Sequence, residues 1–296
     1  MNIDAPSRSQ IPALRTLWQE AFGDTDDFLD MFFSTAFATD RCRCITTNDK
    51  VVAALYWFEC QYMGKSIAYI YAVATAKASR GQGLCHQLME NTHQHLAQLG
   101  YEAALLVPGS QKLFQFYERM GYKTCSGICT FDCGADEKTA DLAAASLPCH
   151  SSDNAGISLR QIGKSEFAKL RRAFLPAGSV IQEKEHLDFL EKQANFYAGD
   201  GFLLVASGNG DTLFGIELLV DENISESETS EIAAFKTLAS KILSSLGYQK
   251  GTFRTPVQIH SSQDFRTSCK EVPFAMYYPL GTSELAPPDY FGFAFD

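Results

Sequence analysis

One turn in the chain, residues 73–85, carries the clearest structural signal, and it reads Val73-Ala74-Thr75-Ala76-Lys77-Ala78-Ser79-Arg80-Gly81-Gln82-Gly83-Leu84-Cys85. It follows a β-like run over residues 66–75 and precedes a pattern over residues 82–99 that predicts a helix ending at Gly100. Two glycines at such a turn let backbone N–H groups approach a ligand closely. Because the first turn of a helix presents unpaired N–H donors and the positive end of its dipole, this turn predicts a pyrophosphate site, to which Arg80 adds a guanidinium.

The spacing of the glycines excludes two common phosphate-binding motifs. The chain has no Gly-x-x-x-x-Gly-Lys-Ser/Thr sequence, which a P-loop requires, and no complete Gly-x-Gly-x-x-Gly sequence, which a Rossmann dinucleotide site requires. A short Gly-x-Gly alone is equally compatible with an ordinary glycine turn. A second motif is therefore needed to decide what this turn does.

Two motifs in the same order resemble those of the GCN5-related N-acetyltransferase (GNAT) family. Residues 73–84 look like the family's motif A, Arg/Gln-x-x-Gly-x-Gly/Ala, in which Arg80 and Gly83 match and Cys85 replaces the usual Gly or Ala. Residues 113–122 resemble the signature Phe-Tyr-x-x-x-Gly-Phe and follow an apolar run over residues 103–107 that predicts a buried strand. The resemblance covers roughly residues 10–132. It implies the acyl-CoA N-acyltransferase fold, an α/β fold with a mixed sheet.

The resemblance implies acetyl-CoA as a co-substrate, lying between two parallel strands that separate. Backbone groups of Val73 and Thr75 would pair with the pantetheine arm, and a strand N–H near Val73 would polarise the thioester carbonyl. Backbone N–H groups of the glycine turn would hold the pyrophosphate. The cofactor-binding residues predicted in this way are Val73, Thr75, Arg80, Gly81, Gln82, Gly83, Leu84 and Cys85.

Three residues are candidates for catalysis. Tyr117 matches a tyrosine that many family members use as a general acid, although a chain with 12 Tyr and 22 Phe also packs many aromatic rings. Glu59 ends the strand before the cofactor strand, near where several members place a carboxylate, and is otherwise an exposed charge at a strand end. The Asp296 carboxylate is an alternative base, because the layout is similar to that of the enhanced-intracellular-survival acetyltransferases, whose terminal carboxylate returns to the active site. The apolar tail, residues 290–296, should be docked, and plain packing explains it equally well.

The chain is expected to contain two similar units. Composition favours a domain at residues 1–135, a linker at 136–156 that is rich in Ala, Ser and Asp, and a second domain at 157–296. A helix, a Leu-Gly-Tyr tripeptide and a strand occur in both halves, which predicts a degenerate second GNAT-like unit. Its counterpart of the glycine turn, residues 221–231, is acidic and would repel a pyrophosphate. Helices are predicted in this half over residues 165–175, 183–196 and 230–246, and strands over 202–206, 213–220, 251–255 and 274–279.

Composition excludes several other classes of protein. A net charge of −10, from 25 basic and 35 acidic residues, disfavours general binding to nucleic acid. No stretch approaches the roughly 20 apolar residues of a membrane helix, so no membrane partner is expected. Nine cysteines, an odd number, favour free thiols and a cytoplasmic location. His86, Glu90 and His93 share one helical face, but such a face needs no metal, and none is predicted.

The sequence therefore predicts an N-acetyltransferase that moves an acetyl group from acetyl-CoA to a primary amine by direct attack. An acidic protein suits a cationic acceptor such as a polyamine, an aminoglycoside or a lysine-bearing peptide. The alternative from another class is a non-catalytic acyl-CoA sensor or scaffold whose second half binds a partner. A transferase that uses a longer acyl-CoA also stays open, as does the oligomeric state.

Overall fold

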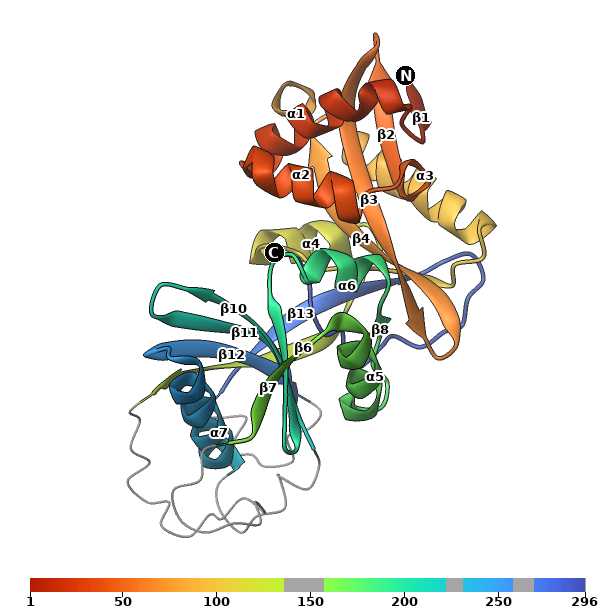
Figure 1. The fold of residues 1–296 in the computed structure, drawn as a ribbon. Helices are drawn as coiled ribbons and strands as arrows, with labels where there is room; N and C mark the ends of the chain where they lie inside the picture. The colour runs from red at the N-terminus through yellow and green to blue at the C-terminus, as the bar shows by residue number, and fades with distance from the viewer. Residues whose placement is uncertain (136–156, 222–230, 258–268, 296) are drawn as a thin grey trace. The chain divides into compact units, whose positions relative to one another are not determined.

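The computed structural model describes residues 1–135, 157–221, 231–257 and 269–295 (Figure 1). The predicted linker, residues 136–156, lies outside this part of the chain. Two compact units share the described residues, and each takes segments from both halves of the sequence. Unit 1 comprises Met1–Cys125, Val180–Lys192 and Ala275–Pro288, and unit 2 comprises Ser126–Ser179, Gln193–Phe274 and Asp289–Asp296.

The sheet of unit 1 has the strand order β1-β2-β3-β4-β5-β13, in which β4 and β5 are parallel and the other neighbours antiparallel. A two-residue strand, β8, also pairs with β3. The strands are β1 (Asn2–Asp4), β2 (Cys42–Thr47), β3 (Lys50–Tyr62), β4 (Lys65–Thr75), β5 (Ala103–Leu106), β8 (Ile181–Gln182) and β13 (Lys270–Pro279). The helices are α1 (Ile11–Phe22), α2 (Asp26–Thr35), α3 (Leu84–Gln98), α4 (Gln111–Glu118) and α6 (Glu185–Leu190), with short 3-10 turns η1 (Arg8–Gln10), η2 (Thr39–Arg41) and η3 (Lys77–Ser79).

Local sequence explains most of these boundaries. The tight turns between β2, β3 and β4 place Asn48, Asp49 and Gly64 at positive φ, which suits these residue types. Thr25 caps α2 by accepting a hydrogen bond from the backbone N–H of Phe28. These residue types therefore account for the two turns and for the start of α2.

Helices cover both faces of this sheet. Figure 1 shows α1 and α2 on one face of β3 and β4 and α3 on the other. The α3 side holds a hydrophobic cluster to which β3, β4, α3 and α4 contribute, including Trp57, Ile70, Leu88 and Tyr117. Burying this apolar stripe, at about 25 cal/mol per Å² of apolar surface, stabilises α3 on the sheet.

Unit 2 repeats the topology of unit 1 in part. Its strand order is β6-β12-β11-β10-β9-β7, in which β11 and β12 are parallel and the other neighbours antiparallel. The strands are β6 (Lys123–Gly134), β7 (Leu159–Ile162), β9 (Asn195–Gly199), β10 (Phe202–Asn209), β11 (Thr212–Val220) and β12 (Lys250–Pro256), and the helices are α5 (Lys164–Phe174) and α7 (Glu231–Leu246).

The Leu-Gly-Tyr tripeptide that occurs in both halves lies at the same kind of junction in each unit. The helices α3 and α7 both lead through a glycine at positive φ, Gly100 and Gly247, into a strand parallel to the preceding one. In each unit an antiparallel strand from a distant part of the chain then flanks that strand: β13 pairs with β5, and β6 pairs with β12.

The predicted helix over residues 183–196 is wrong at its C-terminal end. The helix α6 ends at Leu190, and the strand β9 begins at Asn195. Phe196 and Tyr197 suit a strand, and pairing with β7 and β10 satisfies their backbone groups. Pairing between strands therefore overrides the helical periodicity here.

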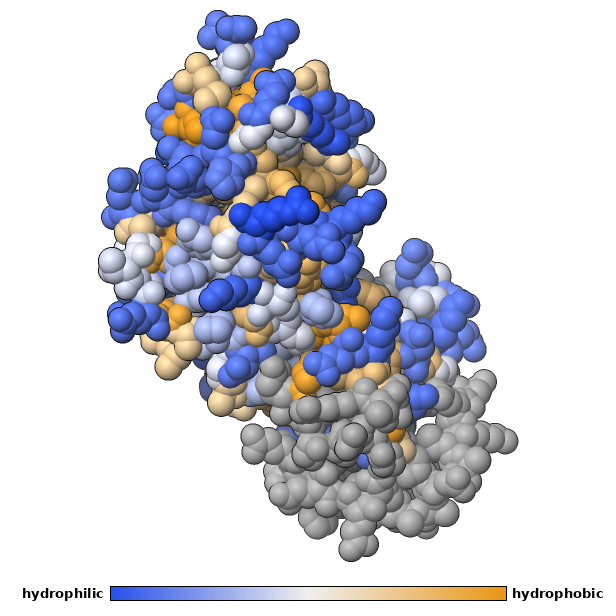
Figure 2. Space-filling view, turned by 180° about the vertical axis from the view of Figure 1, so that it is seen from behind, coloured by the Kyte–Doolittle hydropathy of each residue, from blue (hydrophilic) through white to orange (hydrophobic). Residues whose placement is uncertain are grey.

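Exposed apolar side chains are few and scattered. The large ones among the described residues are Met1, Phe22, Met63, Leu99 and Leu113. The face in Figure 2 is mostly hydrophilic, with apolar side chains in small groups. None of the helices in the described ranges is both long and apolar enough to span a bilayer.

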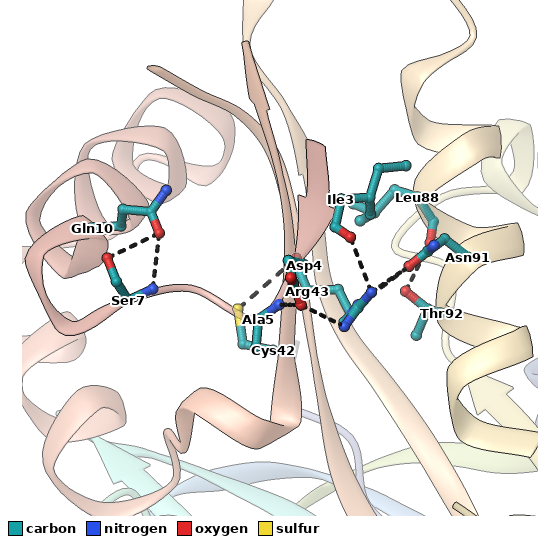
Figure 3. A network of polar contacts seen from close by, with 10 residues as sticks. All are labelled: Ile3, Asp4, Ala5, Ser7, Gln10, Cys42, Arg43, Leu88, Asn91 and Thr92. Carbon is teal, nitrogen blue, oxygen red and sulfur yellow. Dashed lines mark hydrogen bonds and ion pairs between the residues drawn. The ribbon is translucent and has the colours of Figure 1, made fainter. Parts of the chain in front are cut away.

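A buried arginine ties α3 to the edge of the sheet (Figure 3). Arg43 of β2 donates to Asn91 Oδ1 of α3 from two nitrogens, at 2.7 and 3.2 Å. It also donates to the carbonyl oxygen of Ile3 at 3.1 Å and to Asp4 Oδ1 at 3.2 Å. Since Arg43 is only 9% exposed, these acceptors replace the water that its guanidinium loses.

Replacing Arg43 with Leu is expected to lower the free energy of unfolding by about 1–3 kcal/mol, because part-buried acceptors on Asn91 and Ile3 lose their donors. Urea denaturation measures the change. The matched control is Arg160→Leu, because Arg160 makes an ion pair with Glu166 that is exposed and screened by water. An equal loss in both variants would contradict a special role for the Arg43 network.

Candidate active site

The parallel strands β4 and β5 separate part-way along their length. Their register pairs Ile67 with Ala103, Ala68 with Ala104 and Tyr69 with Leu105. Beyond Tyr69, β4 continues to Thr75 with no β5 residue in register, whereas β5 ends at Leu106. Beyond Tyr69 the edge of β4 therefore has no partner from β5 among the described residues, an arrangement that gives room for a ligand of extended shape.

A bulge interrupts β4 at this separation. Tyr71 pairs with Tyr56 and Ala74 pairs with Ala54, so Ala72 and Val73 stand opposite a single residue of β3. Ala72 has a φ of +49°, a conformation that costs an L-residue roughly 1–2 kcal/mol. Such strain persists only where the surrounding structure imposes it, and it is frequent at functional sites.

The connection from β4 to α3 is held by contacts with two other segments, α1 and β3, and by one hydrogen bond back to the end of β4. The backbone N–H of Lys77 donates to Glu20 Oε1 of α1 at 2.6 Å, and the N–H of Ala76 donates to the carbonyl oxygen of Val52 at 2.9 Å. Arg80 Nε donates to the carbonyl oxygen of Thr75 at 3.1 Å. The structure describes no further hydrogen bond of the Arg80 guanidinium. Its terminal nitrogens are therefore available to an anion.

The N-terminus of α3 has the properties of an anion site. Gly81 and Gly83 have φ values of +78° and +75°, which favour glycine, and Gly83 is the N-cap of the helix. No side chain among the described residues caps this end, and its first turn carries no acidic residue. The N–H groups of the first turn and the helix dipole would therefore both favour an anion at this place.

Cys85 points toward the core of unit 1. It packs against the cluster that holds Leu84 and Tyr117, and burial raises the pKa of its thiol to about 11. A thiol of this kind is neutral and poorly reactive at neutral pH. Because the side chain packs inward, it leaves the backbone N–H groups of the turn accessible.

Tyr117 lies in the last turn of α4 and belongs to the same cluster as Leu84 and Leu88 of α3. Its ring centroid is 5.3 Å from that of Phe116 and 5.8 Å from that of Tyr122. Burial, and then the neighbouring Cys85 sulfur, raise the pKa of its hydroxyl well above the usual range. Tyr117 is therefore protonated at neutral pH and able to donate a proton.

Comparison with known protein families gives a match over this part of the chain. A family described as the acetyltransferase (GNAT) domain matches residues 2–125. Residues 2–125 are a GNAT domain. No curated protein matches the sequence.

Solved structures extend the likeness in fold to nearly the whole chain. A GCN5-related N-acetyltransferase from Kribbella flavida has a TM-score of 0.64 at 16% identity, and the match covers 93% of this chain and 70% of that one. Eis1 from Mycobacterium abscessus has a TM-score of 0.64 at 14% identity, with coverage of 94% and 74%. A putative acetyltransferase from Pyrococcus horikoshii has a TM-score of 0.54 at 13% identity, with coverage of 99% and 93%. At these identities the likeness concerns the fold alone.

The structure brings some predicted site residues of the GNAT domain together. Val73, Leu84, Cys85 and Tyr117 all belong to, or pack against, one hydrophobic cluster. Thr75 and Arg80 share a hydrogen bond beside it, and Gly81, Gln82 and Gly83 form the adjoining turn. These residues therefore surround the separated edge of β4.

Glu59 belongs to a different group of side chains. It pairs with Ala68, where β4 is still bonded to β5, and its carboxylate forms an ion pair with Lys184 at 3.1 Å. Its backbone N–H donates to Glu185 Oε1 at 3.0 Å, and Glu185 also contacts Arg41 at 3.5 Å. Asp296, the other candidate base, lies outside the described residues.

Sequence reasoning missed two features near this site. Glu20 carries no signal for its bond to Lys77, because the two residues are 57 positions apart. The segment around α6 also packs on the GNAT domain, where His186 lies 4.4 Å from the ring of Phe58 and stacks on Tyr69 at 5.6 Å. Neither contact has a local sequence pattern that predicts it.

On α3, His93 shares one helical face with His86 and Glu90. His93 Nε2 and the Tyr122 hydroxyl share a hydrogen bond of 2.7 Å, and the imidazole stacks on Tyr278 at 4.3 Å. Burial, and then the charge of His86, lower the pKa of His93 to about 4. His93 is therefore a neutral core residue.

The Gly83→Glu variant is expected to lose measurable binding of acetyl-CoA in a calorimetric titration, whereas the unaltered chain binds it. The new side chain brings negative charge to the anion site and strains a backbone at φ +75°. The matched control is Gly100→Glu, at φ +85° at the other end of α3, which should keep the affinity. Equal losses in both variants would show that backbone strain alone abolishes binding.

The stability of the chain is expected to fall on acidification partly because of His93. Its pKa is lowered in the folded state, so between about pH 6.5 and 4 the unfolded chain takes up a proton that the folded chain does not. The shift corresponds to about 3 kcal/mol lost over this range. Urea denaturation at pH 7 and at pH 4.5 should show a smaller acid-induced loss in His93→Gln than in the unaltered chain. An identical loss would exclude this assignment.

Proposed function

We propose that the chain transfers an acetyl group from acetyl-CoA to a primary amine at the separation of β4 and β5. The observation that carries the proposal is the position of Tyr117, which is kept protonated by burial in the cluster that also receives Val73 and the first turn of α3. A proton donor, a strained strand and an anion site then adjoin one another. This combination fits a thioester substrate with a diphosphate group.

The proposed assignment of binding residues follows the shape of acetyl-CoA. The pantetheine arm lies along the free edge of β4, where backbone groups of Val73 and Thr75 pair with its amides. The pyrophosphate accepts hydrogen bonds from N–H groups of the turn Gly81-Gln82-Gly83-Leu84-Cys85, and the Arg80 guanidinium adds a positive charge.

The proposed reaction is a direct transfer with no covalent enzyme intermediate. The neutral amine attacks the thioester carbonyl, a C–N bond forms, and the C–S bond then breaks. A backbone N–H near Val73 stabilises the developing oxyanion, an effect worth about 3 kcal/mol in other enzymes. The Tyr117 hydroxyl gives its proton to the departing thiolate. The amine loses its proton to a base, and holding both substrates in line contributes the rest.

We retain two candidates for the base, and the chemistry requires only one. Glu59 has a carboxylate side chain that is 31% exposed and forms an ion pair with Lys184. The terminal carboxylate of Asp296 is the second candidate.

A cationic acceptor fits the charge of the protein. The net charge of −10 attracts cations over long range, which favours a polyamine, an aminoglycoside or a lysine-bearing peptide. Every cysteine in the described part of the chain is a free thiol, which supports the proposed cytoplasmic location.

The Tyr117→Phe variant is expected to lower kcat about 10- to 100-fold, at the low end for general acids because a thiolate is already a tolerable leaving group. The Kd for acetyl-CoA should stay unchanged, because the ring is retained. Release of the CoA thiol with a polyamine, an aminoglycoside and a lysine peptide as acceptors measures kcat.

The control for this prediction is Tyr122→Phe, which removes a hydroxyl bonded to His93 in the same cluster. Its kcat should stay within a few-fold of the unaltered chain. Unchanged turnover in Tyr117→Phe would exclude Tyr117 as the general acid. Binding of acetyl-CoA without turnover on any amine would favour a sensor or scaffold instead.

A further inference from the structure

Unit 2 has its own separated pair of parallel strands. The strands β11 and β12 pair from Thr212 with Lys250 to Gly215 with Phe253, and β11 then continues to Val220. As in β4, a bulge follows the separation, because the register with β10 skips Ile216. By this comparison Glu217 corresponds to Ala74, the first paired residue after the bulge of β4.

Glu217, just after the bulge of β11, forms a buried ion pair. Arg171 of α5 meets Glu217 with two hydrogen bonds, Nε to Oε2 at 2.7 Å and Nη2 to Oε1 at 2.8 Å. Their side chains are only 2% and 1% exposed. Removing two charges from water costs several kcal/mol, so the remaining donor and acceptor positions need polar or aromatic partners.

The C-terminal tail, residues 289–295, supplies such partners. The Tyr290 hydroxyl donates to Glu217 Oε1 at 3.0 Å, and the ring of Phe293 lies 4.5 Å from the guanidinium carbon of Arg171. The backbone N–H groups of Asp289 and Tyr290 donate to the carbonyl oxygen of Gly178 at 3.0 and 3.4 Å.

The burial of this tail is nearly complete. Tyr290 is 1% exposed, and Phe291 and Phe293 are 0% exposed, which is unlike a frayed chain end. Phe291 packs against Phe274, whose ring also lies 5.8 Å from the Arg254 guanidinium carbon. The tail therefore fills its site with rings and satisfies the charges beneath it.

The tail lies on a particular face of the sheet of unit 2. Glu217 faces α5, whereas the next residue, Leu218, belongs to the cluster that packs against α7. In unit 1 the corresponding face of β4 is the one opposite α3, on the side of α1. Since α3 carries the proposed pyrophosphate site, the opposite face is the side from which an acceptor approaches.

We propose that the chain's own C-terminal tail occupies, in unit 2, the counterpart of the acceptor site of unit 1. The comparison with an acceptor site in unit 1 rests on the proposed function. That the tail fills its site in unit 2 does not rest on it. An external acceptor would have to displace Tyr290 and Phe293 and remove their contacts with a buried ion pair. In the described part of unit 2 this place is filled, and the tail acts as its internal ligand.

Hydrogen exchange on the full chain tests the occupancy. Backbone amides of residues 290–295 are expected to exchange at least about a hundredfold more slowly than in a free peptide of residues 289–296, since buried, packed segments open rarely. The Tyr290→Phe variant, which removes only the hydroxyl bonded to Glu217, should speed this exchange about tenfold and leave α3 unchanged. Tyr248→Phe, in the same unit but outside the network, is the control and should leave the tail rates unchanged.

Tail amides that exchange as fast as the free peptide would overturn the proposal, and so would unchanged rates in Tyr290→Phe. A second measurement uses the peptide of residues 289–296 as a probe. It should bind a chain that ends at Pro288 and should not bind the intact chain, whose site is filled. Binding of the peptide to the intact chain would also overturn the proposal.

If the shortened chain does not fold, Glu217→Gln in the full chain replaces it. This variant should speed hydrogen exchange of the tail amides at least tenfold, and unchanged rates would also overturn the proposal.

A titration with acetyl-CoA on the same samples separates this proposal from the proposed function. If the tail amides of a variant exchange faster while the variant still binds acetyl-CoA, the change is confined to unit 2 and leaves the proposed function untouched.

Discussion

Parallel pairing between β4 and β5 stops at Tyr69 and Leu105, and the rest of the candidate site depends on that separation. The bulge at Ala72 and Val73 keeps β4 bonded to β3 while its other edge leaves β5. Beyond that point β5 offers this edge of β4 no partner in register. A ligand with its own amide groups would complete the edge.

The surrounding elements hold this arrangement from several sides. Arg43 fixes α3 against β1 and β2, and Glu20 fixes the start of the turn that leads into α3. The anion site is therefore positioned by contacts between secondary-structure elements more than by the turn itself. Preorganisation of this kind lowers the loss of conformational entropy that accompanies ligand binding.

Much of unit 1 could be predicted from local sequence, because periodicity, turn residues and the two motifs all lie within short windows. Gly83 and Leu84 lie at the start of α3, in the helix that the sequence predicts over residues 82–99, and the residues of the second motif form α4 and the turn after it. The bulge at Ala72 could not be predicted, since alanine at positive φ has no signature in the sequence. Nor could the Arg171–Glu217 pair, because its residues lie 46 positions apart and each alone looks like a surface charge. The end of α6 was mispredicted for a related reason: strand pairing with distant residues decided it.

The strand beside β5 has a consequence for how the chain is made. Leu106 pairs with Met276, which lies 276 − 106 = 170 positions later. At a translation rate of roughly 5–20 residues per second, the ribosome needs on the order of ten to thirty seconds to supply that partner. During this time the outer edge of β5 is an apolar, unpaired strand, the kind of surface that recruits other chains. The nascent protein is therefore exposed to aggregation until β13 emerges, and a chaperone that shields strand edges would act on it at this stage.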